Sequence, residues 1–355
     1  MMAKVLMKGN EAIGAAAIKA GCKYFFGYPI TPQNELPEYM SRELPKNDGV
    51  FLQAESEVSA INMVYGAAGA GARVMTSSSS PGIALKQEGI TYIAGAELPC
   101  VIVNIVRGGP GLGGIQPAQS DYNQVTRGGG NGDYKLLVFA PANLQEMVDL
   151  MQDAFDAADY YRNPVMMVGD GMIGQMMEPI EFKSPSKRYE LKDKPWATTG
   201  TKGQRKPNII NSLALDPAEL EKHNERLQVK YNEMKEKEVR YEVYNMENAE
   251  IVLVAYGTTS RIVKNAINEL KEQNINVGLI RPITLWPFPE KAFDEIPTTC
   301  KSLMSVEMSM GQMVDDVKIA SNGRWPVHFY GRSGGMVPTP EGVIEKVKEL
   351  VGGAK

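Results

Sequence analysis

The stretch Cys100–Gly114, CVIVNIVRGGPGLGG, joins an apolar run to a glycine-rich loop. An apolar run of this length, with a single polar residue in it, is typical of a strand that is buried on both faces in a parallel sheet. In open α/β sheets the loops at the carboxyl ends of the strands collect the ligand, and this loop comes directly after such an end. The stretch therefore predicts a helix-covered parallel sheet with a ligand site at its carboxyl edge.

Similar apolar runs alternate with small-residue helical stretches from Val5 to about Ile180. This alternation predicts a doubly wound α/β domain, with helices on both faces of the sheet. Besides Cys100–Ile105, the expected strands are Tyr24–Phe26, Val50–Leu52, Ala72–Met75, Leu136–Phe139 and Pro164–Val168.

The composition changes between about residues 181 and 242, where Pro, Lys, Asp and Ser give way to a charged stretch. Apolar residues recur there at every seventh position, which predicts a helix with a narrow apolar stripe. These residues are Leu220, Leu227, Met234 and Tyr241. We interpret this part as a connecting arm whose helix packs by one edge. A dedicated coiled-coil contact is the alternative.

A second, smaller α/β unit follows the arm. Its expected strands are Ile251–Tyr256, Val277–Ile280, Ser302–Val306 and Val327–Tyr330, with a turn at Gly257–Ser260 and a helix at Ile262–Lys271 after the first strand. Pro282, Pro287 and Pro289 cannot lie inside a sheet, so we expect them to end the second strand. The sequence thus predicts an N-terminal domain (1–180), a linker with a charged helix (181–247) and a C-terminal domain (248–355).

The overall composition narrows the class of protein. A chain of 355 residues, 43% hydrophobic and 23% charged, is typical of a globular protein with two or three domains. Its formal net charge of -4 gives no excess of positive charge for nucleic-acid phosphates. No apolar run is long enough to span a bilayer, and the first residues become polar too soon for a secretory signal. We therefore expect a cytoplasmic protein with no nucleic-acid or membrane partner.

The cysteines and histidines exclude several kinds of site. Cys22, Cys100 and Cys300 lie far apart and form no CxxC pair, so thiolates of this chain cannot assemble a zinc site or an iron–sulfur cluster. His223 and His328 are the only histidines, which makes a histidine-based triad hard to build. Electrons that leave this protein through clusters would therefore pass to another chain.

Two hydroxyl-bearing turns are candidates for ligand binding. In Gly27–Pro32 two prolines stiffen the backbone around Thr31, whose hydroxyl can donate to a ligand oxygen. A proline-rich turn in which Thr31 caps a helix from Gln33 to Met40 is the alternative. Thr76–Gly82 places four serines and a threonine before a helix, which suits an anion or the polar edge of a cofactor.

Charged side chains mark two further segments. Glu57 stands at the start of the small-residue helix expected at Val58–Gly71, where a buried carboxylate costs desolvation unless a ligand or the helix dipole compensates. Capping of backbone donors by Glu55 and Glu57 is the alternative. Arg107 can form two parallel hydrogen bonds to a substrate carboxylate, while the glycines after it let the loop close. The glycines by themselves are weak evidence for phosphate binding.

These segments together carry a resemblance to a known family. They are YPITP at Tyr28–Pro32, the Glu55–Gly71 segment, TSSSSPG at Thr76–Gly82 and VRGGPGLGG at Val106–Gly114. In this order they resemble the alpha subunit of 2-oxoacid:ferredoxin oxidoreductases, most of all the branched-chain (2-oxoisovalerate) type. Four later segments resemble the transketolase-C-terminal-like domain of that family: Gly257–Ile262, Arg281–Pro289, Val306–Met313 and Gly331–Glu341. The resemblance implies a doubly wound, pyrimidine-type thiamine-diphosphate-binding domain followed by that α/β domain.

The resemblance also implies an activity that this chain would not have alone. The enzyme would oxidatively decarboxylate a 2-oxoacid, 3-methyl-2-oxobutanoate in the branched-chain type, to acyl-coenzyme A and carbon dioxide, with ferredoxin as electron acceptor. Coenzyme A would be a co-substrate, and iron–sulfur clusters would lie on a ferredoxin-like subunit, with a gamma subunit completing the complex. A 2-oxoglutarate or pyruvate type, a stand-alone transketolase-like transferase and a non-catalytic anion-binding scaffold are the alternatives.

The same resemblance assigns roles to residues. Glu57 would lie against N1′ of the aminopyrimidine ring and control its tautomer. Thr31 and Arg107 would hold the carboxylate and keto end of the substrate. The remaining cofactor-binding residues would be Tyr28, Pro29, Ile30, Ser79 and Ser80.

The segment Gly169–Gly171, GDG, opens like the motif that binds the metal of thiamine diphosphate. That motif also needs an asparagine downstream, and there is none between Met172 and Pro207. We therefore interpret the segment as a turn at the end of a strand and predict no metal site here. A beta subunit with the complete motif would hold Mg²⁺ and the diphosphate.

Overall fold

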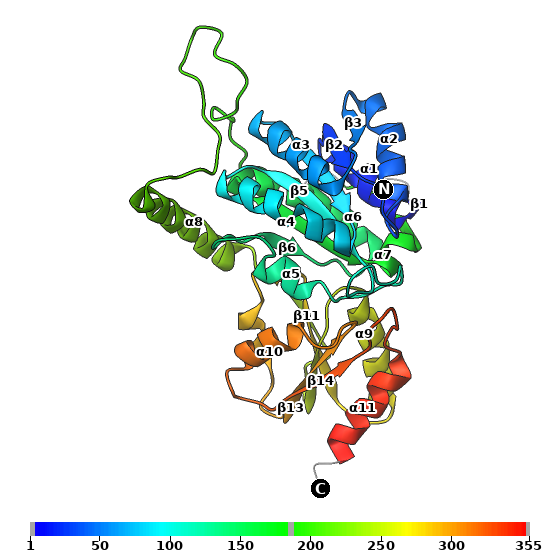
Figure 1. Cartoon of the computed structure of the whole chain (residues 1–355). Helices are drawn as coiled ribbons and strands as arrows, with labels where there is room; N and C mark the ends of the chain where they lie inside the picture. Colours follow the sequence, from blue (N-terminus) through cyan, green and yellow to red (C-terminus); the bar gives the residue numbers. More distant parts are fainter. Residues whose placement is uncertain (1–3, 184–187, 353–355) are drawn as a thin grey trace.

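The computed structural model describes residues 4–183 and 188–352, which fold into two layered α/β units joined by an arm (Figure 1). The first unit is built on seven strands: β2 (Tyr24–Gly27), β3 (Val50–Gln53), β4 (Val74–Ser78), β5 (Cys100–Val106), β6 (Leu137–Phe139), β7 (Pro164–Asp170) and β12 (Thr284–Trp286). Their order is β12-β6-β7-β5-β4-β2-β3, with β5 buried along its whole length near the centre. All pairs except β12 with β6 are parallel, which confirms the expected parallel sheet.

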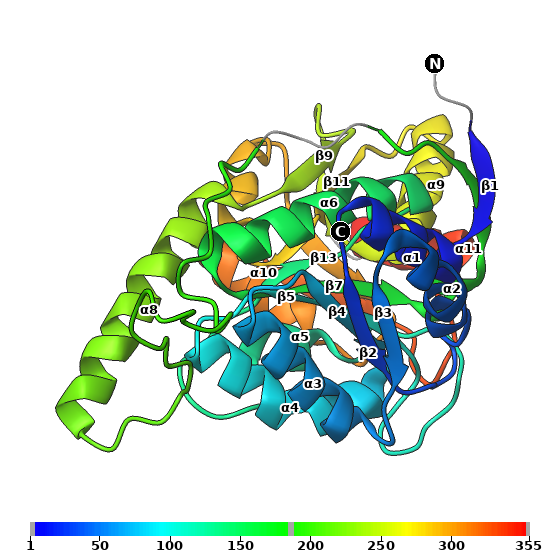
Figure 2. The ribbon, with the colours of Figure 1, turned by 90° about the horizontal axis from the view of Figure 1, so that it is seen from above.

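Helices cover both faces of this sheet. They are α1 (Gly9–Lys19), α2 (Glu35–Glu43), α3 (Glu57–Gly69), α4 (Ser80–Gly95), α5 (Tyr122–Arg127), α6 (Leu144–Tyr161) and α7 (Gly171–Gln175), with a short 3₁₀ turn at Pro45–Asn47. The pair α3 and α4 packs on one face, and α1 and α6 pack on the other (Figure 2). β1 (Val5–Lys8) and β8 (Met177–Ile180) form a separate antiparallel ribbon. None of the described helices has the length and apolar character needed to cross a membrane.

Two elements near the expected ligand site differ from the sequence prediction. β4 runs on to Ser78 and α4 begins at Ser80, so only Ser79 of the expected hydroxyl-rich turn lies between them. Thr76 to Ser78 pair with β5 and lie buried. α2 begins at Glu35 with Asn34 at its N-cap position, so Thr31 does not cap the helix. Of the hydroxyl groups in these two segments, those of Ser78 and Ser79 are buried without a hydrogen-bond partner.

The arm contains α8 (Pro217–Lys237), a charged helix that packs against the first unit by one edge, as expected. Its buried residues are Leu227, Tyr231 and Met234, spaced by four and three residues on one face. The predicted places of Leu220 and Tyr241 in this stripe are wrong, since Leu220 is exposed and Tyr241 lies beyond the helix. The helix ends at Lys237, and Tyr241 begins strand β9 (Tyr241–Tyr244) instead, which pairs with the second sheet.

The second unit is a five-stranded sheet of order β14-β13-β10-β11-β9. Its further elements are β10 (Ile251–Val254), β11 (Val277–Pro282), β13 (Ser302–Glu307), β14 (Val327–Gly331), α9 (Gly257–Glu272), α10 (Met313–Ser321), α11 (Pro340–Gly352) and the 3₁₀ helix at Glu290–Glu295. The four expected strands are present. The expected turn at Gly257–Ser260 is instead the first turn of α9.

The chain crosses from the second sheet to the edge of the first. β11 ends at Pro282 as the prolines predicted, but Thr284–Trp286 then crosses to the first unit and pairs antiparallel with β6. Sequence reasoning missed this strand because the four residues between Pro282 and Pro287 are too few to show a strand pattern. Next to the crossing, Arg281 donates to both carboxylate oxygens of Glu146 at 2.8 Å, which adds a paired charge contact between the units.

Asp170 of the GDG segment also joins the units. It ends β7 and caps α7, since its Oδ1 accepts hydrogen bonds from the backbone nitrogens of Met172 (2.8 Å) and Ile173 (3.2 Å). Its other oxygen accepts from the hydroxyl of Thr258, at the start of α9. Burial raises the pKa of this carboxyl group. The segment is thus a strand end and a helix cap, and the Asp170 carboxylate is occupied by groups of this chain.

Candidate active site at the carboxyl edge of the first sheet

The four segments that the sequence marked for ligand binding follow the carboxyl ends of β2, β3, β4 and β5, which are neighbours in the sheet. The guanidinium of Arg107 donates to the backbone carbonyl of Thr31 at 2.9 Å, which links the first and fourth segments. The hydroxyl of Ser80 accepts from the backbone nitrogen of Arg107 at 3.0 Å, which links the third and fourth. Gly82 lies against the side chain of Glu57 and links the second and third. The expected clustering is therefore present in the fold.

Glu57 lies in the first turn of α3 with only 7% of its surface exposed. The helix is capped by Ser56, whose hydroxyl accepts from the backbone nitrogen of Ser59 at 3.1 Å. The capping role that was the alternative for Glu57 is thus performed by its neighbour. Within residues 4–183 and 188–352, the Glu57 carboxylate has no hydrogen-bond or ion-pair partner, and it lies near the positive end of the helix dipole, which favours a negative charge. Such a carboxylate is available to a ligand.

The wall beside Glu57 is formed by the close approach of α4. A Cβ atom at Gly82 would lie 2.0 Å from Ser78 Oγ and 2.8 Å from Glu57 Oε1. Both distances are too short for an unstrained side chain. Glycine at this position therefore lets α4 pack against the carboxylate.

We expect Gly82→Ala to destabilise the chain by about 1–3 kcal/mol, because the added methyl group overpacks the wall. Gly66→Ala in α3 is the matched control: a Cβ there meets nothing within 4 Å. Alanine should stabilise that exposed helical position by roughly 0.5–1 kcal/mol. Urea denaturation of both variants measures the two changes. Equal and favourable effects would show that the Gly82 wall tolerates a side chain.

Buried polar atoms without a partner gather at the same edge of the sheet. They are Gln33 Nε2, Ser78 Oγ, Ser79 Oγ, Asn104 Oδ1 and Arg107 Nε. A buried polar atom left without a hydrogen bond costs about 1–3 kcal/mol, so several at one place indicate a site that a polar ligand completes. The Gln33 side chain is oriented by Ser77, whose hydroxyl donates to its Oε1 at 2.6 Å, so that its amide nitrogen stays unpaired.

Arg107 holds two loops together. Its Nη1 donates to the Thr31 carbonyl and its Nη2 donates to the Leu112 carbonyl at 3.0 Å, so the guanidinium connects the proline-rich turn with the glycine-rich loop. A guanidinium has five N–H donors, and these two bonds leave three, including that of the buried Nε. A carboxylate can therefore still be bound through Nε and one terminal nitrogen.

The other predicted site residues have different surroundings. Thr31 is half-buried, and its hydroxyl accepts from Asn34 Nδ2 at 3.3 Å. Tyr28 and Pro29 are exposed and Ile30 is half-buried, so their side chains are open to a ligand or a partner chain. Ser79 is fully buried with an unpaired hydroxyl. The Ser80 hydroxyl is hydrogen-bonded to the backbone of Arg107, so it holds the start of the glycine-rich loop in place.

Sequence reasoning missed several residues of this site besides Gln33. Asn104 donates to Asp121 Oδ2 at 2.9 Å, and burial raises the pKa of the Asp121 carboxyl group. Lys86 lies fully buried in α4. Two signals were present: Asn104 is the one polar residue in the apolar run of β5, and Lys86 falls between Ile83 and Ile90 on the buried helix face.

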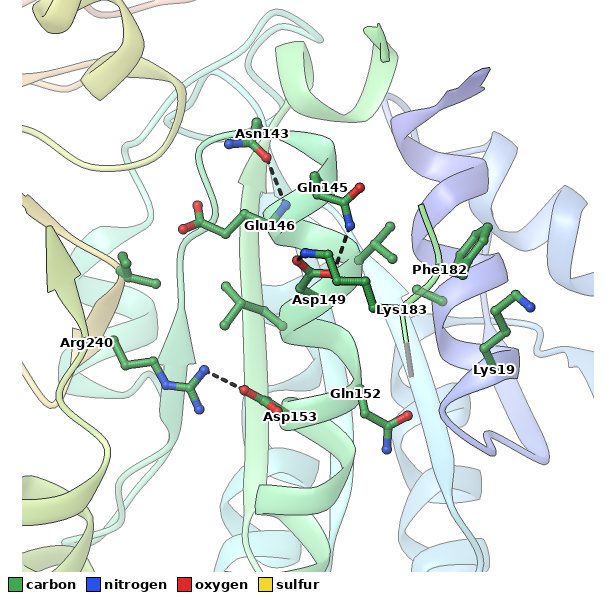
Figure 3. A pocket seen from close by; sticks show the side chains of 14 residues that line it. Lys19, Asn143, Gln145, Glu146, Asp149, Gln152, Asp153, Phe182, Lys183 and Arg240 are labelled. Atoms are coloured by element: carbon green, nitrogen blue, oxygen red, sulfur yellow. Dashed lines mark hydrogen bonds and ion pairs between the residues drawn. The ribbon is translucent and has the colours of Figure 1, made fainter. Parts of the chain in front are cut away.

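A large cavity of about 880 Å³ lies away from this site, along α6 on the other face of the sheet (Figure 3). Its wall carries paired charges: Lys183 contacts Asp149 at 2.5 Å, and Arg240 contacts Asp153 at 2.6 Å. None of the residues predicted from the sequence to bind substrate or cofactor lines it. Its size alone therefore does not make it the functional site.

Known proteins match this chain over nearly its whole length. The family model described as pyruvate flavodoxin/ferredoxin oxidoreductase, thiamine-diphosphate-binding, matches residues 15–250, and that of pyruvate:ferredoxin oxidoreductase core domain II matches residues 249–343. The ketoisovalerate oxidoreductase subunit VorB of Methanothermobacter marburgensis is 50% identical and covers 99% of both chains. The 2-oxoglutarate synthase subunit KorA of Methanocaldococcus jannaschii is 36% identical and covers 94% of this chain and 96% of the relative.

Solved structures show the same fold. The 2-oxoglutarate:ferredoxin oxidoreductase of Magnetococcus marinus, solved with 2-oxoglutarate, coenzyme A and succinyl-CoA bound, matches with a TM-score of 0.87 at 27% identity. The match covers 99% of this chain and 66% of that longer one. A split-gene transketolase matches with a TM-score of 0.60 at 14% identity, a likeness of fold alone. The predicted pairing of a thiamine-diphosphate-type domain with a transketolase-like domain is confirmed.

Proposed function

Because this chain belongs to the 2-oxoacid:ferredoxin oxidoreductase family, we propose that it is the alpha subunit of an enzyme that oxidatively decarboxylates 3-methyl-2-oxobutanoate. The products would be the acyl-coenzyme A and carbon dioxide, with ferredoxin reduced. The choice of substrate is supported by the 50% identity to a ketoisovalerate oxidoreductase subunit, against 36% to a 2-oxoglutarate synthase subunit. The observation that carries the proposal is the buried Glu57 carboxylate, which faces a site where four segments meet and is left for a ligand.

The residues at this edge fit the aminopyrimidine end of thiamine diphosphate. That ring offers several hydrogen-bonding nitrogens, and the edge offers unpaired polar atoms of Gln33, Ser78 and Ser79 beside the Glu57 carboxylate. When bound, the cofactor supplies the electron sink that decarboxylation of a 2-oxoacid requires. Glu57 and Ser79 would hold its ring, and the Tyr28–Ile30 turn would cover it.

Glu57 has one chemical task in this proposal: its carboxyl group exchanges a proton with the ring nitrogen N1′. A carboxyl group in hydrogen-bond reach of that nitrogen acts as general acid and base. Burial keeps water away from the exchange, and the start of α3 stabilises the ionised carboxylate. The helix and the Gly82 wall hold the side chain in place for it.

Arg107 and Thr31 would bind the carboxylate end of the 2-oxoacid. The three free donors of Arg107 would form charge-assisted hydrogen bonds to the substrate carboxylate. The Thr31 hydroxyl, which lies on a stiff turn, would help to orient the substrate. This carboxylate leaves as neutral carbon dioxide, so binding it too tightly would stabilise the ground state more than the transition state. A guanidinium that shares its donors with two backbone carbonyls meets that requirement.

The proposal needs partner chains. The GDG motif of this chain lacks its downstream asparagine, and both oxygens of its Asp170 carboxylate accept hydrogen bonds from this chain, from the start of α7 and from Thr258. Mg²⁺ and the diphosphate would therefore be held by a beta subunit with a complete GDG…N motif. Iron–sulfur clusters would lie on a ferredoxin-like subunit, a gamma subunit would complete the complex, and coenzyme A would be the acyl acceptor.

Reconstitution tests the proposed function. The chain is co-purified with the products of its neighbouring genes and assayed for dye reduction with 3-methyl-2-oxobutanoate, 2-oxoglutarate and pyruvate, each with coenzyme A. We expect the highest kcat/KM for 3-methyl-2-oxobutanoate. A higher kcat/KM for 2-oxoglutarate or pyruvate would identify that acid as the substrate and leave the family unchanged. An assembled complex that reduces no dye with any of the three 2-oxoacids would contradict the proposed function.

A further inference from the structure

The outward face of the α3–α4 pair carries almost no charge. Figure 2 shows the two helices as the outermost layer on their side of the first sheet. No residue from Val58 to Gly69 is charged. The charged residues of α4 are Lys86, which is fully buried, and Glu88, whose carboxylate accepts a hydrogen bond from the Tyr92 hydroxyl at 2.7 Å. In contrast, α8 and α11 carry charged side chains at most of their exposed positions.

Large apolar side chains lie exposed on this face. Val58 of α3 is 43% exposed, and Leu85 and Tyr92 of α4 are 54% and 41% exposed. A helix that faces water ordinarily presents charged or polar side chains to it. An exposed face that is poor in charge and holds large apolar and aromatic side chains is typical of the core of a protein–protein interface.

The arm extends this face past the ends of both helices. Two contacts fix it there: the backbone nitrogen of Thr198 donates to the Gly69 carbonyl at 2.9 Å, and His223 Nε2 lies 2.8 Å from the Gly95 carbonyl. Residues 209–215 lie between these contacts in the chain, pass close to both glycines and contain no charged residue. Their outward side chains are 71–85% exposed: Ile209, Leu213 and Leu215. The outer face of α3 and α4 and residues 209–215 together form one uncharged surface.

The position of this uncharged surface indicates which chain covers it. Val58 directly follows Glu57, and Leu85 lies one turn after Gly82, the glycine that packs against the Glu57 carboxylate. A chain that holds the diphosphate end of a cofactor bound at Glu57 must come within one cofactor length of these residues. A second copy of this chain offers no such site, because its GDG carboxylate is bonded within its own chain.

We propose that the uncharged surface, from the first turns of α3 and α4 to residues 209–215 of the arm, is the docking surface for the beta subunit. The contact with that subunit starts at the rim of the active site and continues along both helices, over roughly 20–24 Å for helices of this length. The inference rests on the proposed function, because the beta subunit is the chain that this function requires. Binding of the two chains can nevertheless be measured without any turnover.

The first test measures the Kd between this chain and the purified product of the neighbouring gene that carries the complete GDG…N motif, by biolayer interferometry. Leu85→Arg and Leu213→Arg each place a charge in the proposed contact, one on α4 and one in the arm. Each should raise Kd by about thirtyfold or more, because the charge loses its water without gaining a partner. Wild-type affinity in both variants would overturn the proposal, and a loss in only one of them would overturn a continuous surface.

Ile319→Arg is the matched control. Ile319 is 62% exposed on α10, a helix of the second unit that also carries charged residues. The same kind of substitution there should leave Kd within about twofold of the wild-type value, the small effect expected away from a contact. An equal loss of affinity in this variant would show a general effect of added charge and contradict the proposal. If Leu85→Arg does not fold, Leu85→Gln tests the same position.

The second test measures the mass of this chain alone in solution by light scattering, with and without Leu85→Arg. We expect the same mass for both proteins, since the surface is reserved for the beta subunit. A dimer of the wild-type chain that Leu85→Arg dissociates would assign the surface to a second copy and overturn the beta subunit as its occupant. Tight binding of the two wild-type chains without any 2-oxoacid activity of the assembled complex would instead contradict the proposed function and leave the docking surface standing.

Discussion

Replacing Glu57 by glutamine should lower kcat of the assembled complex by about 10²–10⁴-fold, the range that general acid–base catalysis contributes. Glutamine keeps the size of the side chain but has no proton to exchange with the ring nitrogen. Because α3 is capped by Ser56, the substitution should leave the helix and the assembly of the complex intact. Steady-state kinetics, with size-exclusion chromatography to check assembly, measure both outcomes.

Glu55→Gln provides the matched control for this prediction. Glu55 lies two residues earlier, is exposed, and stands outside α3. Its substitution removes the same charge from the same segment, and kcat should stay close to the wild-type value. Equal losses in the two variants would indicate a general effect of charge, whereas full activity of Glu57→Gln would remove Glu57 from the mechanism.

Arg107→Ala should lower kcat/KM for every 2-oxoacid by roughly ten- to a hundredfold, because hydrogen bonds to a charged group are worth about 1.5–3 kcal/mol each. Most of the loss should appear in KM, since the arginine binds the carboxylate that all these substrates share. The variant also loses the bonds to the Thr31 and Leu112 carbonyls. Kinetics with several 2-oxoacids measure whether the loss is uniform.

Arg107→Lys separates charge from geometry. Lysine keeps the positive charge but cannot supply the planar fork that contacts two loops and a carboxylate at once. We expect kcat/KM between those of the wild-type and alanine variants. A loss confined to one substrate in either variant would make Arg107 a selector of the substrate side chain instead of a carboxylate-binding residue.

Much of the fold could be predicted because its signals are local. A run such as Cys100–Val106 shows burial on both faces in its own residues, and the strands around it follow the same pattern. Thr284–Trp286 could not be found this way, because its pairing with β6 depends on a partner far away in the chain. Tyr241 was misplaced because a spacing of seven continues through a helix end that only tertiary packing reveals.

Part of the candidate site could also be predicted because its signals are local in the sequence. Its four segments carry polar residues at strand ends, and the parallel sheet brings such ends together. Other features depend on three-dimensional proximity: Arg107 bonds to the carbonyls of Thr31 and Leu112, and the buried Lys86 bonds to Thr76 and Ser77 of β4. These contacts join residues from separate elements, and no spacing in the sequence encodes them.

The alternative of a stand-alone, transketolase-like transferase is disfavoured by the surroundings of Asp170. A chain that worked alone would have to hold the metal and diphosphate itself. Here the GDG carboxylate accepts hydrogen bonds from the start of α7 and from Thr258, and it is buried where the two units meet. This favours an enzyme whose cofactor is shared between two chains.

The structure of the assembled complex with thiamine diphosphate bound tests the central claim most directly, through the distance between the Glu57 carboxylate and ring nitrogen N1′. We predict that a Glu57 oxygen lies within hydrogen-bond distance of that nitrogen, about 2.6–3.2 Å. A complex in which the carboxylate points away from the ring, or in which another side chain occupies this position, would contradict the account.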